Sequence, residues 1–119
     1  MTPEDELKER LARVRARFAD ALDGKIADSF TALEQMAGGP ETIDTVVVAH
    51  RRLHELCGLA PTLGFAAIGK AARAAETVMR PAANSKRALT PAEIGELKDE
   101  LERLRAVAAG ELQAYSGQA

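Results

Sequence analysis

The chain has few aromatic residues. Only 3% of its 119 residues are aromatic, tryptophan is absent, and the four that occur are Phe18, Phe30, Phe65 and Tyr115. Strands are enriched in aromatic and β-branched side chains, which fill the space between packed sheets. So small an aromatic content leaves little material for the core of a β-sandwich or barrel.

Other absences narrow the class of protein. The lone cysteine, Cys57, excludes an internal disulfide and is typical of the reducing cytoplasm, where we expect this protein. The formal net charge of −2 lacks the basic surplus of a nucleic-acid binder. No apolar run approaches the roughly 20 residues of a membrane span, and we see no signal peptide. We therefore expect one cytoplasmic domain, residues 1–119, that binds neither nucleic acid nor membrane.

What the chain does contain is alanine and charge, with 24 alanines and 29% charged residues. This composition is typical of closely packed helices. The first helical segment begins at Thr2, a capping hydroxyl before Pro3. Apolar residues then recur at steps of three and four: Leu7, Leu11, Val14, Phe18, Leu22, Ile26, Phe30, Leu33 and Met36. We expect Gly24 to be a point where this segment can kink or break, and Gly38-Gly39 to end it.

Three further segments follow. The second opens at Pro40-Glu41 and ends at Pro61, with a buried stripe of Val46, Ala49, Leu53, Leu56 and Ala60. The third starts near Leu63 and ends before Pro81, turning inward Phe65, Ile68, Ala72, Ala75 and Met79. We expect residues 81–89 to form a loop. The capping box Thr90–Glu93 starts the last helix, which presents Ile94, Leu97, Leu101, Leu104, Ala108, Leu112 and Tyr115 on one face. The pattern predicts an all-α protein, an antiparallel up-and-down four-helix bundle with an extra N-terminal helical segment.

Two histidines, His50 and His54, stand four residues apart in the second segment and so share a face. At about 100° per residue this face lies away from the buried stripe. Apolar Ile43 and Val47 lie beneath His54, and Gly58, one turn further on, offers no side chain. A helical glycine costs about 0.5–1 kcal/mol relative to alanine, so it calls for a reason. Close approach by another protein supplies one, and we interpret this face as a docking site.

The stretch from Leu53 to Phe65, LHELCGLAPTLGF, resembles the signature of histidine-phosphotransfer (HPt) domains. That signature is a histidine, any residue, leucine, lysine, glycine, five variable residues ending in an apolar one, and glycine. The matching residues are His54, Leu56, Gly58, Leu63 and Gly64, and Glu76 matches a later position often filled by glutamine or glutamate. The resemblance implies a four-helix bundle whose exposed histidine accepts a phosphoryl group from an aspartyl phosphate and passes it to another aspartate.

The resemblance also implies the partners. These are response-regulator receiver domains, which would contribute Mg²⁺ and a lysine, together with a hybrid histidine kinase. This chain itself shows no ATP loop, and we expect no cofactor, no resident metal and no autokinase activity. We expect a monomer, with Gly58, Gly64, His50 and Cys57 among the residues at the docking face.

One departure from the signature concerns charge. The family usually places a lysine three residues after the histidine, where it helps to neutralise the phosphoryl group, and this chain has Cys57 there. Arg51, one turn before His54, and Arg73, which an antiparallel neighbour would bring level with it, are the candidates to screen the phosphate. Glu76 is expected to orient the imidazole of His54 by accepting its other N–H.

Three alternatives remain open from the sequence. His50, His54 and Cys57 could bind zinc, although a fourth ligand is not evident. His54-Glu55-Leu56 is also faintly similar to the dimerisation and phosphoacceptor helices of sensor histidine kinases, which lack the paired glycines. A non-catalytic helical adaptor, in which His54 is incidental, is the third.

Overall fold

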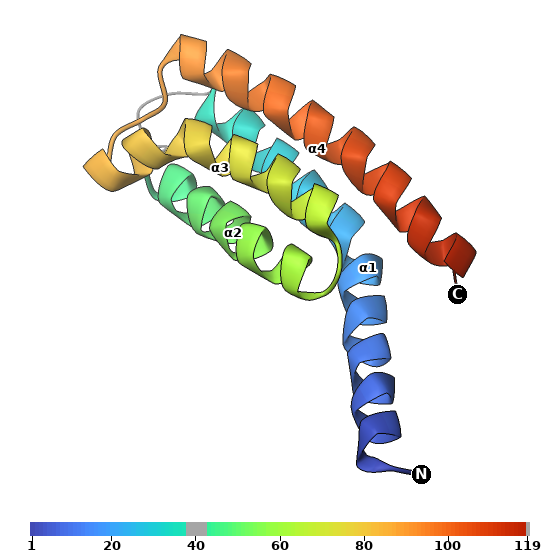
Figure 1. Cartoon of the computed structure of the whole chain (residues 1–119). Helices are drawn as coiled ribbons and strands as arrows, with labels where there is room; N and C mark the ends of the chain where they lie inside the picture. The colour runs from blue at the N-terminus through green and yellow to red at the C-terminus, as the bar shows by residue number, and fades with distance from the viewer. Residues whose placement is uncertain (38–42, 119) are drawn as a thin grey trace.

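The computed structural model describes residues 1–37 and 43–118, and these form four helices and no strand. They are α1 (Pro3–Met36), α2 (Ile43–Thr62), α3 (Ala66–Ser85) and α4 (Pro91–Gln118). The helices run alternately up and down, with α2 beside α3, α3 beside α4, and α1 closing the bundle (Figure 1). The predicted four-helix bundle is confirmed. The helix stop expected at Gly38-Gly39 and the start expected at Pro40-Glu41 lie outside the described residues.

Helix α1 is uninterrupted through Gly24, so the segment does not break there. Its 34 residues correspond to about 51 Å at 1.5 Å per residue, which explains the 56 Å length of the molecule. A capping box of Thr2 and Asp5 fixes its first turn, each residue bonding the backbone N–H of the other. The extra N-terminal segment is therefore the first part of α1 and not a separate helix.

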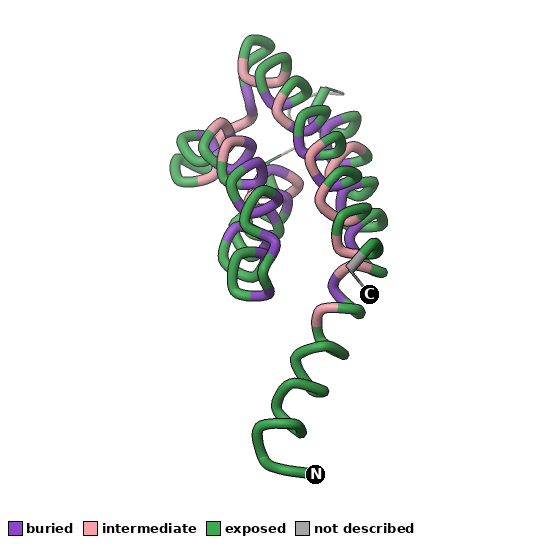
Figure 2. Tube along the Cα trace, turned by 45° about the vertical axis from the view of Figure 1, so that its right-hand side comes forward, coloured by how far each residue is buried: buried purple, intermediate pink, exposed green. Residues whose placement is uncertain are grey.

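The first turns of α1 extend beyond the bundle (Figures 1 and 2). On the apolar side of this part of α1, Leu7 is 66% exposed, Leu11 is 46% exposed and Val14 is 44% exposed. Phe18 and Leu22, further along the same side, are buried. The apolar side of α1 passes from exposed to buried near Arg15, whose Nε donates a hydrogen bond to the Leu63 carbonyl at 2.9 Å. The same guanidinium lies over the rings of Phe65 and Tyr115. The apolar spacing thus continues past the point where the bundle ends.

Helices α2 and α3 form a tight antiparallel hairpin. The predicted stripe of α2 is buried in full, and α2 continues through Pro61 to end at Thr62. Gly64 makes the turn with φ +90, a conformation that favours glycine. Gly69 lets the helices approach, since a Cβ there would lie 2.5 Å from Pro61 Cγ. This close packing fixes the register in which residues of α2 face those of α3.

The expectation that Pro81 ends the third helix is wrong, because α3 continues to Ser85. A proline inside a helix removes one backbone hydrogen bond, but tertiary packing can outweigh that loss. Here Ala82, one residue later, is fully buried in the core. The helix instead ends at Ser85, and Lys86, with a left-handed φ of 51, is its C-cap.

The start of α4 follows the prediction. Thr90 and Glu93 form both hydrogen bonds of the capping box, and Arg87 adds a two-pronged ion pair to the Glu93 carboxylate. The side chains that α4 contributes to the core are Leu97, Leu101, Leu104 and Ala108. None of the helices in the described part combines the length and hydrophobicity that a bilayer crossing demands.

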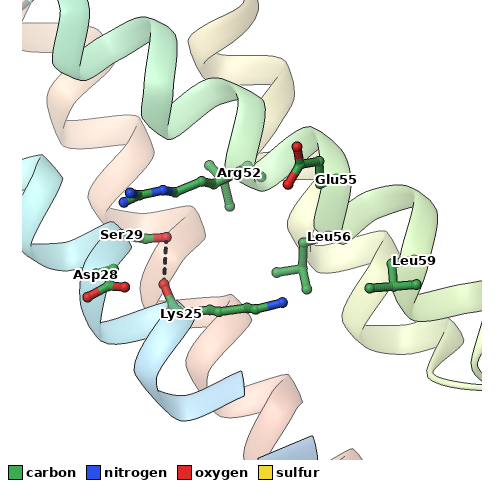
Figure 3. A pocket seen from close by; sticks show the side chains of 8 residues that line it. Lys25, Asp28, Ser29, Arg52, Glu55, Leu56 and Leu59 are labelled. Atoms are coloured by element: carbon green, nitrogen blue, oxygen red, sulfur yellow. Dashed lines mark hydrogen bonds between the residues drawn. The ribbon is translucent and has the colours of Figure 1, made fainter. Parts of the chain in front are cut away.

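A cleft of about 340 Å³ lies between α1 and α2 (Figure 3). Its lining is Lys25, Asp28, Ser29, Arg52, Leu53, Glu55, Leu56 and Leu59. At about 100° per residue, Arg52, Glu55 and Leu59 occupy the side of α2 roughly opposite His54. The cleft is therefore separate from the histidine face.

Candidate functional site

His54 lies at the start of the fourth turn of α2 and points away from the core, as predicted. Its side chain is 72% exposed. The neighbouring residues Leu53 and Leu56 on the same helix are buried, so the backbone that carries His54 is anchored while the ring remains accessible. A neutral imidazole in such a position offers a nitrogen lone pair to a reactant brought by another molecule.

Glu76 of α3 faces this ring across the hairpin. Its side chain is only 3% exposed, and its Oε1 lies 3.5 Å from His54 Nδ1. The antiparallel register thus brings Glu76 level with His54, as the sequence predicts. At this distance the contact is between a charged oxygen and a ring nitrogen, longer than an ordinary hydrogen bond. The closest histidine partner of Glu76 is instead His50.

His50 is not the surface residue that the sequence suggests. Its side chain is 18% exposed, and its Nε2 lies 2.9 Å from Glu76 Oε1. Its ring stacks on that of His54 with the centroids 6.2 Å apart and an angle of 22° between the planes. Both histidines therefore face the same carboxylate oxygen, one at hydrogen-bond distance and the other slightly beyond it.

Arg80 completes the group around Glu76 and was not assigned a role from the sequence. Its Nε donates to Oε1 at 3.2 Å, and one of its terminal nitrogens donates to Oε2. This hydrogen bonding by Arg80, more than the bond from His50, holds the pKa of Glu76 below its usual value although burial opposes the shift. A buried carboxylate needs such compensation. The signal in the sequence is the four-residue spacing of Glu76 and Arg80, which places both on one face of a helix.

The two predicted screening arginines are exposed, Arg51 on α2 and Arg73 on α3. Neither forms an ion pair within the described part of the chain. Burial raises the pKa of the Cys57 thiol, Glu76 raises it further, and the charge of Arg73 opposes the change. Arg73 therefore lies close enough to act electrostatically on the position where the family signature has lysine.

The predicted docking residues divide into two groups. Ile43 is 38% exposed, Val47 is half-buried, and Gly58 is exposed, with no atom beyond the adjacent helix backbone within 4 Å of where a Cβ would stand. Cys57, by contrast, is buried in the core, so its assignment to the docking face is wrong: its position on α2 turns it toward α3. The docking role of Gly64 stays a prediction, while its positive φ accounts for glycine in the turn.

Metal binding by the two histidines receives no support from the geometry. Within residues 1–37 and 43–118, no three His, Cys, Asp or Glu side chains are grouped so that they could hold an ion. Cys57, the third residue of the zinc hypothesis, is buried in the core, whereas the His54 ring is largely exposed.

Comparison with known families identifies the family of this chain. The model of the Hpt domain family matches residues 4–107 of the 119, so this chain belongs to that family. At the level of the family, its function is histidine phosphotransfer in two-component phosphorelays, in which these domains interact with receiver domains and histidine kinases. No curated protein and no solved structure shows significant similarity to the chain.

Proposed function

We propose that this protein relays a phosphoryl group between receiver-domain aspartates, with His54 as the residue that carries it. The observation behind the proposal is the exposed His54 ring, whose Nδ1 faces a buried carboxylate. The lone-pair directions of the two ring nitrogens diverge, so this exposed ring with Nδ1 toward Glu76 directs Nε2 away from that carboxylate. His50 is a poorer acceptor because its Nε2 is already bonded to Glu76.

The reaction needs little from this chain beyond that nitrogen. The Nε2 lone pair attacks the phosphorus of the aspartyl phosphate, an N–P bond forms, and the acyl O–P bond breaks to release the aspartate carboxylate. The phosphorylated ring carries a positive charge and keeps its proton on Nδ1. The Glu76 carboxylate, 3.5 Å away and held ionised, stabilises that charge. The Mg²⁺ that assists the transfer belongs to the receiver domain in this proposal.

Arg73 and Arg51 are proposed to replace the missing lysine. Both are exposed and free of carboxylate partners in the described residues, and Arg73 already acts on the Cys57 position. Arg80 is less available, since Glu76 engages its guanidinium. A planar guanidinium presents paired N–H donors that match two phosphate oxygens, whereas a lysine ammonium acts as a point charge.

Transfer from a phosphorylated receiver domain tests the acceptor. The chain is mixed with ³²P-labelled receiver domains of its host, and the modified residue is located by mass spectrometry under neutral conditions. His54→Gln should remove the label and leave helicity and the thermal midpoint unchanged. The matched variant His50→Gln should still carry label at His54. Label that persists in His54→Gln, or that maps to His50, would refute the assignment.

A second measurement addresses the screening residues. Arg73→Ala should slow transfer more than Arg51→Ala, because the charge of Arg73 acts on the pKa of Cys57, which occupies the position of the family lysine. Loss of a charge-assisted hydrogen bond of about 1.5 kcal/mol corresponds to roughly a tenfold slower rate. Equal transfer rates for the wild type and both single variants would show that neither arginine screens the phosphoryl group.

A further inference from the structure

His50 occupies a position that phosphotransfer by His54 does not itself explain. If the side chain of His50 only filled space beside His54, it would need no specific polar contact. Instead its Nε2 contacts Glu76 Oε1, the same oxygen that lies nearest to His54 Nδ1. One carboxylate oxygen thus connects the two rings.

The geometry determines which proton lies between His50 and Glu76. Arg80 keeps Glu76 ionised, and an ionised carboxylate only accepts hydrogen bonds. At 2.9 Å, His50 must therefore carry hydrogen on Nε2 and donate it. With the Nε hydrogen of Arg80 on the same oxygen, Oε1 receives two donors and has a defined orientation. The other carboxylate oxygen, Oε2, is held by Arg80.

The two donors approach the carboxylate from different helices. Arg80 lies one turn further along α3 and, acting alone, would draw the carboxylate along its own helix. His50 lies on α2, the helix that carries His54, and stacks on the His54 ring. Its hydrogen bond holds Oε1 across the helix interface, on the α2 side where His54 Nδ1 lies.

We propose that His50 is a positioning residue, whose Nε2–H holds the Glu76 carboxylate facing Nδ1 of His54. The inference rests on the proposed function, because positioning has meaning only if His54 reacts. His50 touches neither the phosphoryl group nor the attacking nitrogen. Through Glu76, it favours the His54 tautomer with hydrogen on Nδ1 and leaves the Nε2 lone pair free for attack.

A pair of variants separates positioning from packing. His50→Leu replaces the ring with an apolar side chain that has no hydrogen-bond donor. His50→Gln instead provides an amide N–H that can donate to Oε1 of Glu76. We expect His50→Leu to transfer about tenfold more slowly, as the loss of one charge-assisted hydrogen bond predicts. His50→Gln should restore most of the rate. Equal rates for His50→Leu and the wild type, or equal losses in both variants, would overturn the proposal.

The tautomer of His54 gives a readout that packing alone would not change. Long-range ¹H–¹⁵N NMR of the wild-type chain should show hydrogen on Nδ1 of His54 and on Nε2 of His50. In His50→Leu the His54 ring should become a mixture of tautomers. A wild-type His50 with its hydrogen on Nδ1 would refute the proposal without any variant having to fold.

The outcome is distinguishable from failure of the proposed function. If His54 is not the acceptor, His54→Gln still becomes labelled, whatever His50 does. If His54 is the acceptor but His50 has no positioning role, label is lost in His54→Gln while His50→Leu transfers at the normal rate with an unchanged His54 tautomer.

Discussion

The two parts of α1 have the same apolar spacing and opposite surroundings. Leu7, Leu11 and Val14 lie on the part that extends beyond the bundle, while Leu22 and Ile26 are buried against the other helices (Figure 2). Both parts belong to one uninterrupted helix. The comparison shows that a three- and four-residue period reports which side of a helix is apolar and does not report whether a neighbour covers that side.

The reason for the difference lies in the lengths of the neighbours. Helices α2 and α3 have 20 residues each, or about 30 Å, whereas α1 has 34. The α2–α3 turn meets α1 at Arg15, through the bond to the Leu63 carbonyl. N-terminal to that point, α1 has no helix of the hairpin beside it.

Core truncation should produce the largest contrast between the two parts. Leu22→Ala removes a fully buried side chain and should lower the free energy of unfolding by about 3 kcal/mol. Leu11→Ala, the same change on the projecting part, should alter it by less than about 0.5 kcal/mol. Urea unfolding followed by circular dichroism measures both. Comparable losses would mean that Leu11 is packed in solution, and that the two parts of α1 do not differ in their surroundings.

Acid sensitivity should distinguish the two capping boxes. Arg87 is the main cause that lowers the pKa of Glu93 to about 2, from a usual value of 4.5. The folded state therefore binds fewer protons than the unfolded state between these values, so stability is present above pH 4.5 and is lost as the pH falls toward 2. The pair is partly exposed, so solvent screening weakens its contribution to stability.

Glu93→Gln should accordingly flatten the fall in stability over this pH range. Part of the slope should remain, because Arg80 also holds the pKa of Glu76 below its usual value. Asp5→Asn, the matched change in the box of α1, should leave the profile of global unfolding unaltered, since the projecting turn contributes little to the bundle. An identical acid profile for Glu93→Gln and the wild type would contradict the expected role of the Arg87–Glu93 pair.

Loss of the capping hydroxyl provides a smaller contrast. Thr90→Ala should cost about 1 kcal/mol of global stability, because the first turn of α4 leads directly into the buried Leu97. Thr2→Ala breaks the same hydrogen bond at the exposed end of α1. Its effect should be confined to fraying, seen as faster amide exchange in residues 4–8 with no change in the unfolding midpoint. Equal shifts in the midpoint would indicate that both ends unfold cooperatively.

Much of this architecture could be predicted from the sequence because it depends on local patterns. The stripe of α2, the capping box at Thr90 and the exposure of His54 all follow from helical periodicity and cap chemistry. The antiparallel register of neighbouring segments was enough to bring Glu76 level with His54. The prediction that Pro81 ends the third helix is wrong because the tolerance of this proline depends on how Ala82 packs, and a local pattern does not contain tertiary packing.

The assignment of side-chain partners was harder for the same reason. The sequence pairs Glu76 with His54, whereas the structure places its hydrogen bonds on His50 and Arg80. A difference of less than 1 Å decides which histidine the carboxylate bonds, and residue spacing does not resolve such distances. Likewise, Cys57 at the third residue after His54 lies on the side of α2 that α3 covers.

Removal of the projecting turns should produce the smallest effect and tests the comparison most directly. Deletion of residues 1–13 keeps Arg15 with its bond to Leu63 and keeps every core residue of α1 from Phe18 onward. We expect the free energy of unfolding to change by less than about 0.5 kcal/mol, because no buried contact is lost. The helical signal should fall only by the share of the deleted turns. Calorimetry of the two chains measures the difference, and a loss above about 2 kcal/mol would show that the projecting part of α1 packs against the bundle in solution. An unchanged stability would instead show that the apolar spacing of Leu7, Leu11 and Val14 does not serve the fold of this domain.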